Sequence, residues 1–452
     1  MNHALDVVIA ILPLVILIYM MTKKKNVPSH IALPVSAALV YALHLVYAAS
    51  DPNLTNATVL KGALAALTPI SIIWGAILLT KTMQLSGAGK VVRSWLFGIS
   101  SNRVAQLMVI GWAFAFMIEG ASGFGTPAAV AAPILVGLGF EPIPVALLAL
   151  VMNSVPVSFG AVGTPTWFGM GQLGLSHEQL LEIGLKSAFI NSIAALVIPI
   201  IALSFIVSWK EISRNLLFVY LSILSCVIPY GLLASVNYEF PALVGGAIGF
   251  VLSIVLAKKE VGLAPITEKQ ATPDQVEKIP PRTLLRAFFP VIGTILLLIV
   301  TRIPALGIKN LLNAESPSLE VNLGSLGGFN VSAALVLKLS DIFRTGSTWS
   351  YNALFVPALI PFFVMCAVSI PFFRLKGTVV RQIWSESLDR MKKPIITLIG
   401  ALIMVELLMV GGDEAQTMII GKAFAEISGT TWQYVASFLG ALGSFFSGSA
   451  TI

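Results

Sequence analysis

The sequence predicts an all-α polytopic membrane protein with about eleven to thirteen transmembrane helices, some of them re-entrant or broken. Of its 452 residues, 57% are hydrophobic and only 11% are charged, whereas soluble domains carry about a quarter charged residues. Many apolar runs lie between polar or turn-forming segments. A spanning helix needs roughly 20 mostly apolar residues, because the hydrocarbon core is about 30 Å thick.

The apolar runs define the expected crossings in chain order. They lie at 5–21, 31–49, 64–79, 106–118, 143–159, 189–207, 216–234, 241–257, 288–300, 354–373, 395–410 and from 432 onwards. The first run has no basic residue ahead of it and no cleavage region of small residues behind it. We therefore expect a retained first helix rather than a secretory signal. Between 118 and 189 hydropathy leaves open which pieces cross and which re-enter.

Basic residues lie in short runs between the apolar segments. The runs contain Lys23 to Lys25, then Lys81, Lys90, Arg93 and Arg103, then Lys210 and Arg214, then Lys258 and Lys259 through Arg282 and Arg286, and finally Arg374 to Lys393. This distribution favours membrane orientation over nucleic-acid binding as the reason for the net charge of +7. The positive-inside rule places these loops in the cytoplasm and the N-terminus outside. We expect a multi-pass protein of the plasma membrane, which is the inner membrane in a Gram-negative cell.

A polar stretch at 258–283 contains four prolines and many charges. It is typical of a flexible cytoplasmic linker, which would separate a first half at 1–257 from a second half at 284–452. Both halves contain an aromatic residue followed by small and hydroxylated residues, at 116–122 and at 445–451. Paired interruptions of this kind are typical of transporters with inverted repeats, so we expect such a repeat here.

The most informative stretch is 119–127, where three glycines, a serine, a threonine and a proline occur within nine residues. These residues cannot continue a regular helix cheaply, and broken backbone at membrane depth must be buried in protein or line a watery cavity. A helix starting at Pro127 would direct unpaired N–H groups towards an anion. The candidate substrate-binding residues are Gly120, Ala121, Ser122, Gly123, Gly125 and Thr126. The alternative is that small residues here only allow close helix packing.

A second broken stretch covers 153–165. Its candidate substrate-binding residues are Asn153, Ser154, Ser158, Gly163 and Thr164, and Pro156 would free a backbone carbonyl. The alternative is a hydrated loop at the membrane surface. A third candidate segment, with Gly448, Ser449 and Thr451, lies at the end of the sequence.

Ionisable groups within apolar runs are costly and are candidates for function. Glu119 and Glu406 are the strongest candidates for proton coupling, and His44 and Asp6 are weaker ones. For Glu406, a hydrogen bond between helices is an equal alternative.

Other classes of site find little support. The run 123–128 fits the dinucleotide fingerprint GxGxxA, but no strand precedes it and its context is apolar. Cys226 and Cys366 are isolated in apolar stretches, which favours core packing, and the four histidines are scattered. We therefore expect no metal site and no cofactor. Without a clustered nucleophile and base, an intramembrane enzyme is also disfavoured.

The motifs at 119–129, 135–140 and 153–165 are long, and in them the sequence resembles the lactate permease family. The resemblance implies proton symport of lactate or related 2-hydroxymonocarboxylates such as glycolate, with hairpins that meet near the membrane midplane and with homodimers. Family members continue beyond the small-residue motif at 448–452, so we expect a second half truncated at its C-terminal site motif. Left open are a sodium-coupled carrier of another carboxylate or inorganic anion and a passive anion channel.

Overall fold

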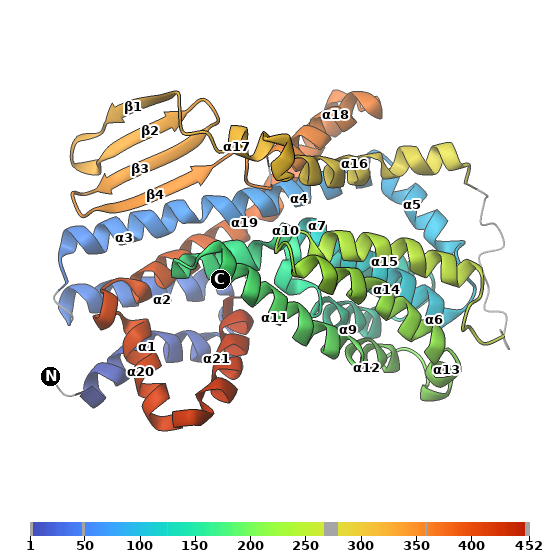
Figure 1. Ribbon diagram of the computed structural model, residues 1–452, viewed down its shortest axis with the longest axis horizontal. Coiled ribbons are helices and arrows are strands. Elements are labelled where there is room, and N and C mark those ends of the chain that lie inside the picture. Colours follow the sequence, from blue (N-terminus) through green and yellow to red (C-terminus); the bar gives the residue numbers. More distant parts are fainter. Residues whose placement is uncertain (1–2, 48–49, 124, 266–278, 358, 448–452) are drawn as a thin grey trace.

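The computed structural model describes residues 3–47, 50–123, 125–265, 279–357 and 359–447 (Figure 1). Within these ranges, eight helices are long and apolar enough to cross a membrane, or nine if the bent pair Pro142–Asn153 and Val157–Gly169 is one span. The predicted class of polytopic helical membrane protein is thereby confirmed. The count is lower than hydropathy suggested, because the runs predicted at 354–373, 395–410 and from 432 onwards are not among these helices. In the first of these runs, the helical segment Leu359–Phe372 is shorter than a full crossing.

One group of helices is built around a long helix of the second half. This α19 group contains α1 (His3–Thr22), α2 (Ser29–Val46), α3 (Pro52–Ala65), α4 (Leu67–Leu85) and α19 (Gly377–Met409), and α19 packs against α2, α3 and α4. Two ion pairs join α3 and α4 to α19. Lys61 lies 2.9 Å from Glu406, and Lys81 pairs with Glu386. Lys61 and Lys81 are 20 residues apart, as are Glu386 and Glu406, so the pairs fix the span formed by α3 and α4 antiparallel to α19 at points about 30 Å apart.

A second group of helices surrounds a central buried span, Arg103–Ser122, of which 94% is buried. It comprises α6 (Arg103–Gln106), η1 (Leu107–Phe114), α7 (Ala115–Ser122), α8 (Thr126–Gly137), α9 (Pro142–Asn153), η2 (Val157–Phe159), α10 (Gly160–Thr164), η3 (Pro165–Gly169), η4 (Met170–Leu173), α11 (His177–Ala195), α12 (Ile198–Ser204), α13 (Trp209–Arg214), α14 (Leu216–Ala234) and α15 (Pro241–Lys258). We call it the α7 group. In its core, α15 lies close to α7, since a Cβ on Gly246 would overlap the backbone of Met117.

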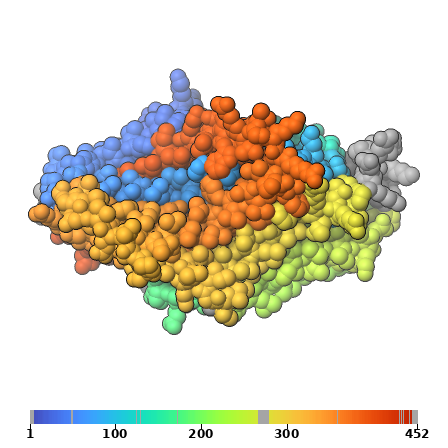
Figure 2. All heavy atoms as spheres, turned by 90° about the horizontal axis from the view of Figure 1, so that it is seen from above, coloured from blue at the N-terminus to red at the C-terminus, as the bar shows by residue number. Residues whose placement is uncertain are grey.

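The remaining elements connect and cover the two groups (Figure 1). They are α5 (Ala88–Phe97), α16 (Pro281–Val300), η5 (Pro304–Leu306), α17 (Ile308–Leu312), η6 (Gly324–Leu326), η7 (Leu359–Val364), α18 (Met365–Phe372), η8 (Gly412–Glu414), α20 (Gln416–Ser428), η9 (Gly429–Thr431) and α21 (Trp432–Ser447). In the view from above, residues of the second half, in yellow to orange, lie between blue N-terminal helices and green residues of the first half (Figure 2). Segments far apart in sequence therefore lie side by side.

A small sheet is the feature that hydropathy did not predict. Its strands β1 (Ser318–Asn322), β2 (Gly328–Ser332), β3 (Val336–Ile342) and β4 (Ser347–Asn352) pair antiparallel in chain order. β4 packs on α3, and Leu339, Ile342 and Trp349 are buried in a cluster with residues of α3, α4 and α19. Sequence analysis left 301–353 without a span, because short polar strands produce no long apolar run.

Candidate functional site

The predicted break after α7 is present. α7 ends at Ser122, Gly123 has φ +57° and ψ −157°, and Gly125 has φ +74°. These are backbone conformations that residues with a Cβ rarely adopt, so glycine at both positions lets the chain turn between two helices. α8 then starts at Thr126 with Pro127 in its first turn, as the sequence predicted.

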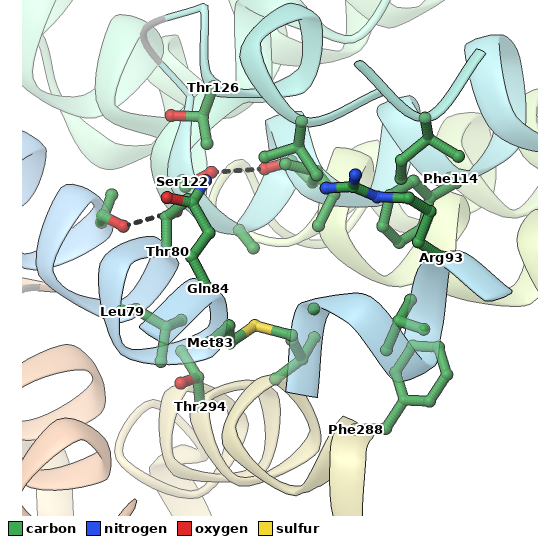
Figure 3. A pocket seen from close by; sticks show the side chains of 18 of the residues that line it. Leu79, Thr80, Met83, Gln84, Arg93, Phe114, Ser122, Thr126, Phe288 and Thr294 are labelled. Carbon is green, nitrogen blue, oxygen red and sulfur yellow. Dashed lines mark hydrogen bonds between the residues drawn. The ribbon is translucent and has the colours of Figure 1, made fainter. Parts of the chain in front are cut away.

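A cavity of about 110 Å³ lies beside this break, between the α19 group and the α7 group (Figure 3). One face of α8 forms part of its wall, and α4, α5, η1, α7, α16 and η7 supply the rest. The lining residues are Ala76, Leu79, Thr80, Met83, Gln84, Gly89, Val92, Arg93, Phe114, Ile118, Ala121, Ser122, Thr126, Val130, Pro133, Ile134, Phe288, Val291, Thr294 and Phe362. Most of the wall is apolar, and a few polar groups are placed on it, which is typical of small-molecule sites.

Arg93 is the one charged side chain among these lining residues. It extends from α5 towards the wall that carries Ser122 (Figure 3). Arg93 is exposed, as are Gln84 and Pro133, whereas Ser122 and Thr294 are buried. The cavity therefore has a mouth near Arg93 and a floor near Ser122 and Thr294. Within the described ranges, no ion pair or hydrogen bond occupies the guanidinium of Arg93, which leaves its donors available.

Three hydroxyl groups on the wall donate to carbonyl oxygens of their own helices. Ser122 Oγ donates to Ile118 O at 2.9 Å, Thr80 Oγ1 to Ala76 O at 2.9 Å, and Thr294 Oγ1 to Pro290 O at 2.7 Å. The oxygen of each hydroxyl can still accept a hydrogen bond from a bound molecule. The hydroxyls of this wall therefore suit a ligand that carries its own O–H donor.

Gly120, another predicted site residue, is packed against a helix. A Cβ at this position would overlap the backbone of Ala242 and Leu243 in α15. Gly120 does not line the cavity. At this position, the contact supports the alternative interpretation, in which the small residues allow close packing of helices.

We expect Gly120→Ala to lower the melting temperature of the detergent-solubilised protein. The added methyl group must push α7 away from α15, at a cost of about 1–3 kcal/mol. The matched control is Gly231→Ala in α14, where no atom lies within 4 Å of the added Cβ and alanine favours the helix. A melting temperature for Gly120→Ala equal to or above that of Gly231→Ala would contradict this packing.

The second predicted break is also present and touches the first. Ala161, Val162 and Gly163 have φ values of +46°, +58° and +71°, which form a left-handed turn. A Cβ on Gly123 would meet Ala161. None of the residues at 153–165 lines the cavity, however.

Three hydroxyl groups of this second segment form hydrogen bonds nearby, whereas the buried Oδ1 of Asn153 has no partner among the described residues. Ser154 is exposed and donates to Val151 O at 2.7 Å, and Thr164 Oγ1 donates to Ala161 O at 2.5 Å. Ser158 Oγ accepts from Asn191 Nδ2 at 3.0 Å. Of the residues predicted to bind substrate, the structure thus brings Ala121, Ser122 and Thr126 to the cavity. Gly448, Ser449 and Thr451 lie outside the described residues.

Glu119 lies between the two breaks, away from the cavity lining. Its side chain is 1% exposed, the side chain of Asn153 lies beside the carboxyl group, and Gly160 leaves room for Oε1. Oε2 has no hydrogen-bond partner in the part of the chain that the structure describes. A buried carboxyl group without a cation is rare at membrane depth and suggests a functional role.

Glu406 has a different environment. Its carboxyl group pairs with Lys61 at 2.9 Å, and neither residue lines the cavity. This ion pair favours the alternative reading of Glu406 as a contact between helices. Among the described residues, no group of three or more His, Cys, Asp or Glu side chains is arranged to hold a metal ion.

Sequence reasoning missed the cationic part of the site. It assigned Arg93 only to membrane orientation, and it did not single out Gln84, Thr80 or Thr294. A signal was present, because Arg93 lies on the short amphipathic helix α5, which directly follows a spanning helix. Which face of α5 meets a cavity depends on packing against α4 and α16, and no local sequence pattern contains this information.

The long apolar helices, with broken helices beside a small cavity, are those of a multi-pass membrane protein. A family model described as L-lactate permease matches residues 6–452. The chain therefore belongs to the L-lactate permease family.

Curated relatives agree with this assignment. A protein of Haemophilus influenzae, provisionally described as an L-lactate permease, is 52% identical over 448 residues, which are 99% of this chain and 84% of the relative. An L-lactate permease of Salmonella typhimurium is 24% identical over 100% of this chain and 82% of its own length. A glycolate permease of Escherichia coli is 42% identical over 105 residues, which are 23% of this chain and 19% of the relative. No solved structure matches the chain.

Proposed function

We propose that this protein takes up lactate or a related 2-hydroxymonocarboxylate such as glycolate by proton symport, and that the substrate binds in the cavity between the two helix groups. The observation that carries this proposal is the position of Arg93, the one cation among the lining residues, at the mouth of a cavity whose floor carries hydroxyl groups. Relatives described as lactate and glycolate permeases support the substrate class.

The lining chemistry matches each part of such a substrate. The guanidinium group of Arg93 can form two parallel hydrogen bonds to a carboxylate. The 2-hydroxyl group of the substrate can donate to Ser122 or Thr294, whose own protons are already engaged. Apolar side chains such as Leu79 and Val291 suit a methyl group. A small anion with one hydroxyl group and little apolar surface is therefore the ligand that this wall accommodates best.

We further propose that Glu119 carries the coupled proton. We also propose that the protein lies in the plasma membrane, with its Arg93 end facing the cytoplasm. The absence of a hydrogen bond to Oε2 among the described residues supports the first part. The positive-inside rule supports the second. A sodium-coupled carrier is the alternative, and uptake into proteoliposomes that persists with an uncoupler and follows a sodium gradient would favour it.

We expect Ser122→Leu to abolish uptake of labelled L-lactate into proteoliposomes while the protein stays folded. The leucine side chain would occupy the floor of a cavity of only about 110 Å³. The matched control is Ser225→Leu in α14, because Ser225 makes the same bond to the carbonyl four residues earlier, at 2.7 Å, but does not line the cavity. Uptake by Ser122→Leu at the rate of the control would refute this assignment of the site.

A further inference from the structure

Helix α16 runs past the cavity and continues beyond its floor. Phe288, Val291 and Thr294 line the cavity. The next turns carry Ile295 and Leu298, and Arg302 lies two residues after the end of the helix. From Phe288 to Arg302 the chain advances about 20 Å at the rise of a helix. The residues beyond Thr294 therefore lie on the path from the cavity floor to the end of the molecule opposite Arg93.

Beyond the floor, the path is filled by apolar side chains from both halves of the sequence. Ala121, Val162, Leu243 and Leu298 form one buried cluster, against which Phe240 and Ile295 pack. We call this cluster the plug. Ala121 belongs to both the cavity lining and the plug, which shows that the two are adjacent. Leu298 is 0% exposed, so the plug has no gap for water at this point.

A buried ion pair lies at the far side of the plug. Arg302 Nε donates to Glu239 Oε2 at 2.7 Å, and the two side chains are only 3% and 13% exposed. Arg302 also donates to Phe355 O at 2.7 Å and to Thr301 Oγ1 at 2.8 Å. Glu239 precedes α15 by two residues and Arg302 follows α16, so the pair joins the α7 group to the second half of the sequence. Burial lowers the pKa of the Arg302 guanidinium group, and the neighbouring carboxylate of Glu239 opposes this shift. The guanidinium group stays charged.

The backbone of the plug is strained at one position. Val162 has φ +58°, which is unusual for a β-branched residue. Its carbonyl accepts a hydrogen bond from Trp167 Nε1 at 3.0 Å, and a Cβ on the neighbouring Gly163 would overlap the Tyr238 carbonyl beside Glu239. The strained turn therefore places Val162 in the plug and fits against the loop that holds Glu239. Strain of this kind is typical of functional sites with more than one state.

We propose that the plug and the Glu239–Arg302 ion pair form a gate that closes the cavity on the side opposite Arg93, and that transport requires Arg302 to separate from Glu239. This inference rests on the proposed transport function. In this proposal, the structure represents the state in which the cavity is open at the Arg93 end of the molecule and closed at the Glu239 end. Breaking a buried ion pair is costly unless new partners or water replace it, so substrate and proton binding would have to favour the open gate.

The first test locks the gate with a reversible cross-link. In a background with Cys226→Ala and Cys366→Ala, Glu239→Cys and Arg302→Cys are joined by a bifunctional methanethiosulfonate and released by dithiothreitol. We expect cross-linking to lower uptake of labelled L-lactate by at least about tenfold, because the open state becomes inaccessible, and dithiothreitol to restore it. Unchanged uptake after complete cross-linking, verified by mass spectrometry, would overturn the proposal.

The matched control cross-links another ion pair of membrane helices. Lys81→Cys and Glu386→Cys join α4 to α19, which lie within one helix group. We expect this variant to transport equally before and after cross-linking. Loss of uptake on cross-linking in both variants would mean that the reagent acts by general rigidification, and it would overturn the gate.

A second test needs no substrate, so it separates failure of the gate from failure of the proposed function. In the same background with Cys226→Ala and Cys366→Ala, Ala121→Cys places a single thiol between the plug and the cavity. We expect a membrane-impermeant maleimide to label this thiol at least about tenfold faster from the Arg93 side than from the Glu239 side, because the plug blocks the route from the Glu239 side. Vesicles that hold the protein in each of the two orientations allow the two rates to be measured. Equal rates from both sides would overturn the gate. If the wild type moved no lactate but this asymmetry held, the proposed function alone would fail.

Discussion

Arg93→Gln is expected to lower lactate uptake by about tenfold to hundredfold at low substrate concentration, since a hydrogen bond to a charged group contributes about 1.5–3 kcal/mol and 1.4 kcal/mol is a factor of ten. Arg93 is the one cation among the lining residues of the cavity. Its loss leaves a carboxylate to be held by hydroxyl groups that already donate to their own helices. The effect should appear mainly as a higher KM, with the maximal rate reduced less.

Two further variants make this prediction specific. Arg93→Lys keeps the charge but cannot form two parallel hydrogen bonds, so it should transport at a rate between those of the wild type and Arg93→Gln. Arg214→Gln removes an exposed cation outside the cavity lining and should transport as the wild type does. Equal losses in Arg93→Gln and Arg214→Gln would indicate a general effect of surface charge and would exclude direct binding by Arg93. Initial rates over a range of lactate concentrations measure all three.

Glu119→Gln is expected to abolish lactate accumulation driven by a pH gradient while leaving exchange of internal for external lactate intact. The glutamine side chain has nearly the shape of a protonated glutamate but cannot release a proton. Glu119 is buried between the two backbone breaks, next to Asn153 and Gly160. Burying a carboxyl group in such a place costs far less free energy when the group is neutral than when it is charged. Release of its proton therefore requires a change in its surroundings.

The measurement compares two assays on the same proteoliposomes. One imposes a pH gradient and records accumulation, and the other records exchange at equal pH on both sides. Glu182→Gln is the control, because Glu182 is exposed and pairs with Lys186 on the surface of α11. Persistent accumulation by Glu119→Gln with an unchanged dependence on pH would remove Glu119 from the coupling mechanism and would return attention to sodium as the coupling ion.

Much of this molecule was predictable from its sequence, because the relevant signals are local. A run of apolar residues marks a spanning helix wherever it packs, and this established the class of helical membrane protein. The glycines and Pro127 at 119–127 specify a break by their own backbone preferences, and the break is found after Ser122. The same motif also placed Ala121, Ser122 and Thr126 among the candidates that line the cavity. The inverted repeat and the division into two halves remain predictions.

The tertiary structure alone decided which distant residues meet. Lys61 is 345 positions from Glu406 and Arg302 is 63 from Glu239, and no local pattern pairs them. Packing likewise turned Gly120 towards α15, Arg93 towards the cavity and the short strands at 318–352 onto α3. Helix propensity and hydropathy depend on neighbours along the chain, whereas a cavity, an ion pair or a gate depends on the angle and depth at which separate helices pack. Those quantities are determined by side-chain interlocking over the whole bundle.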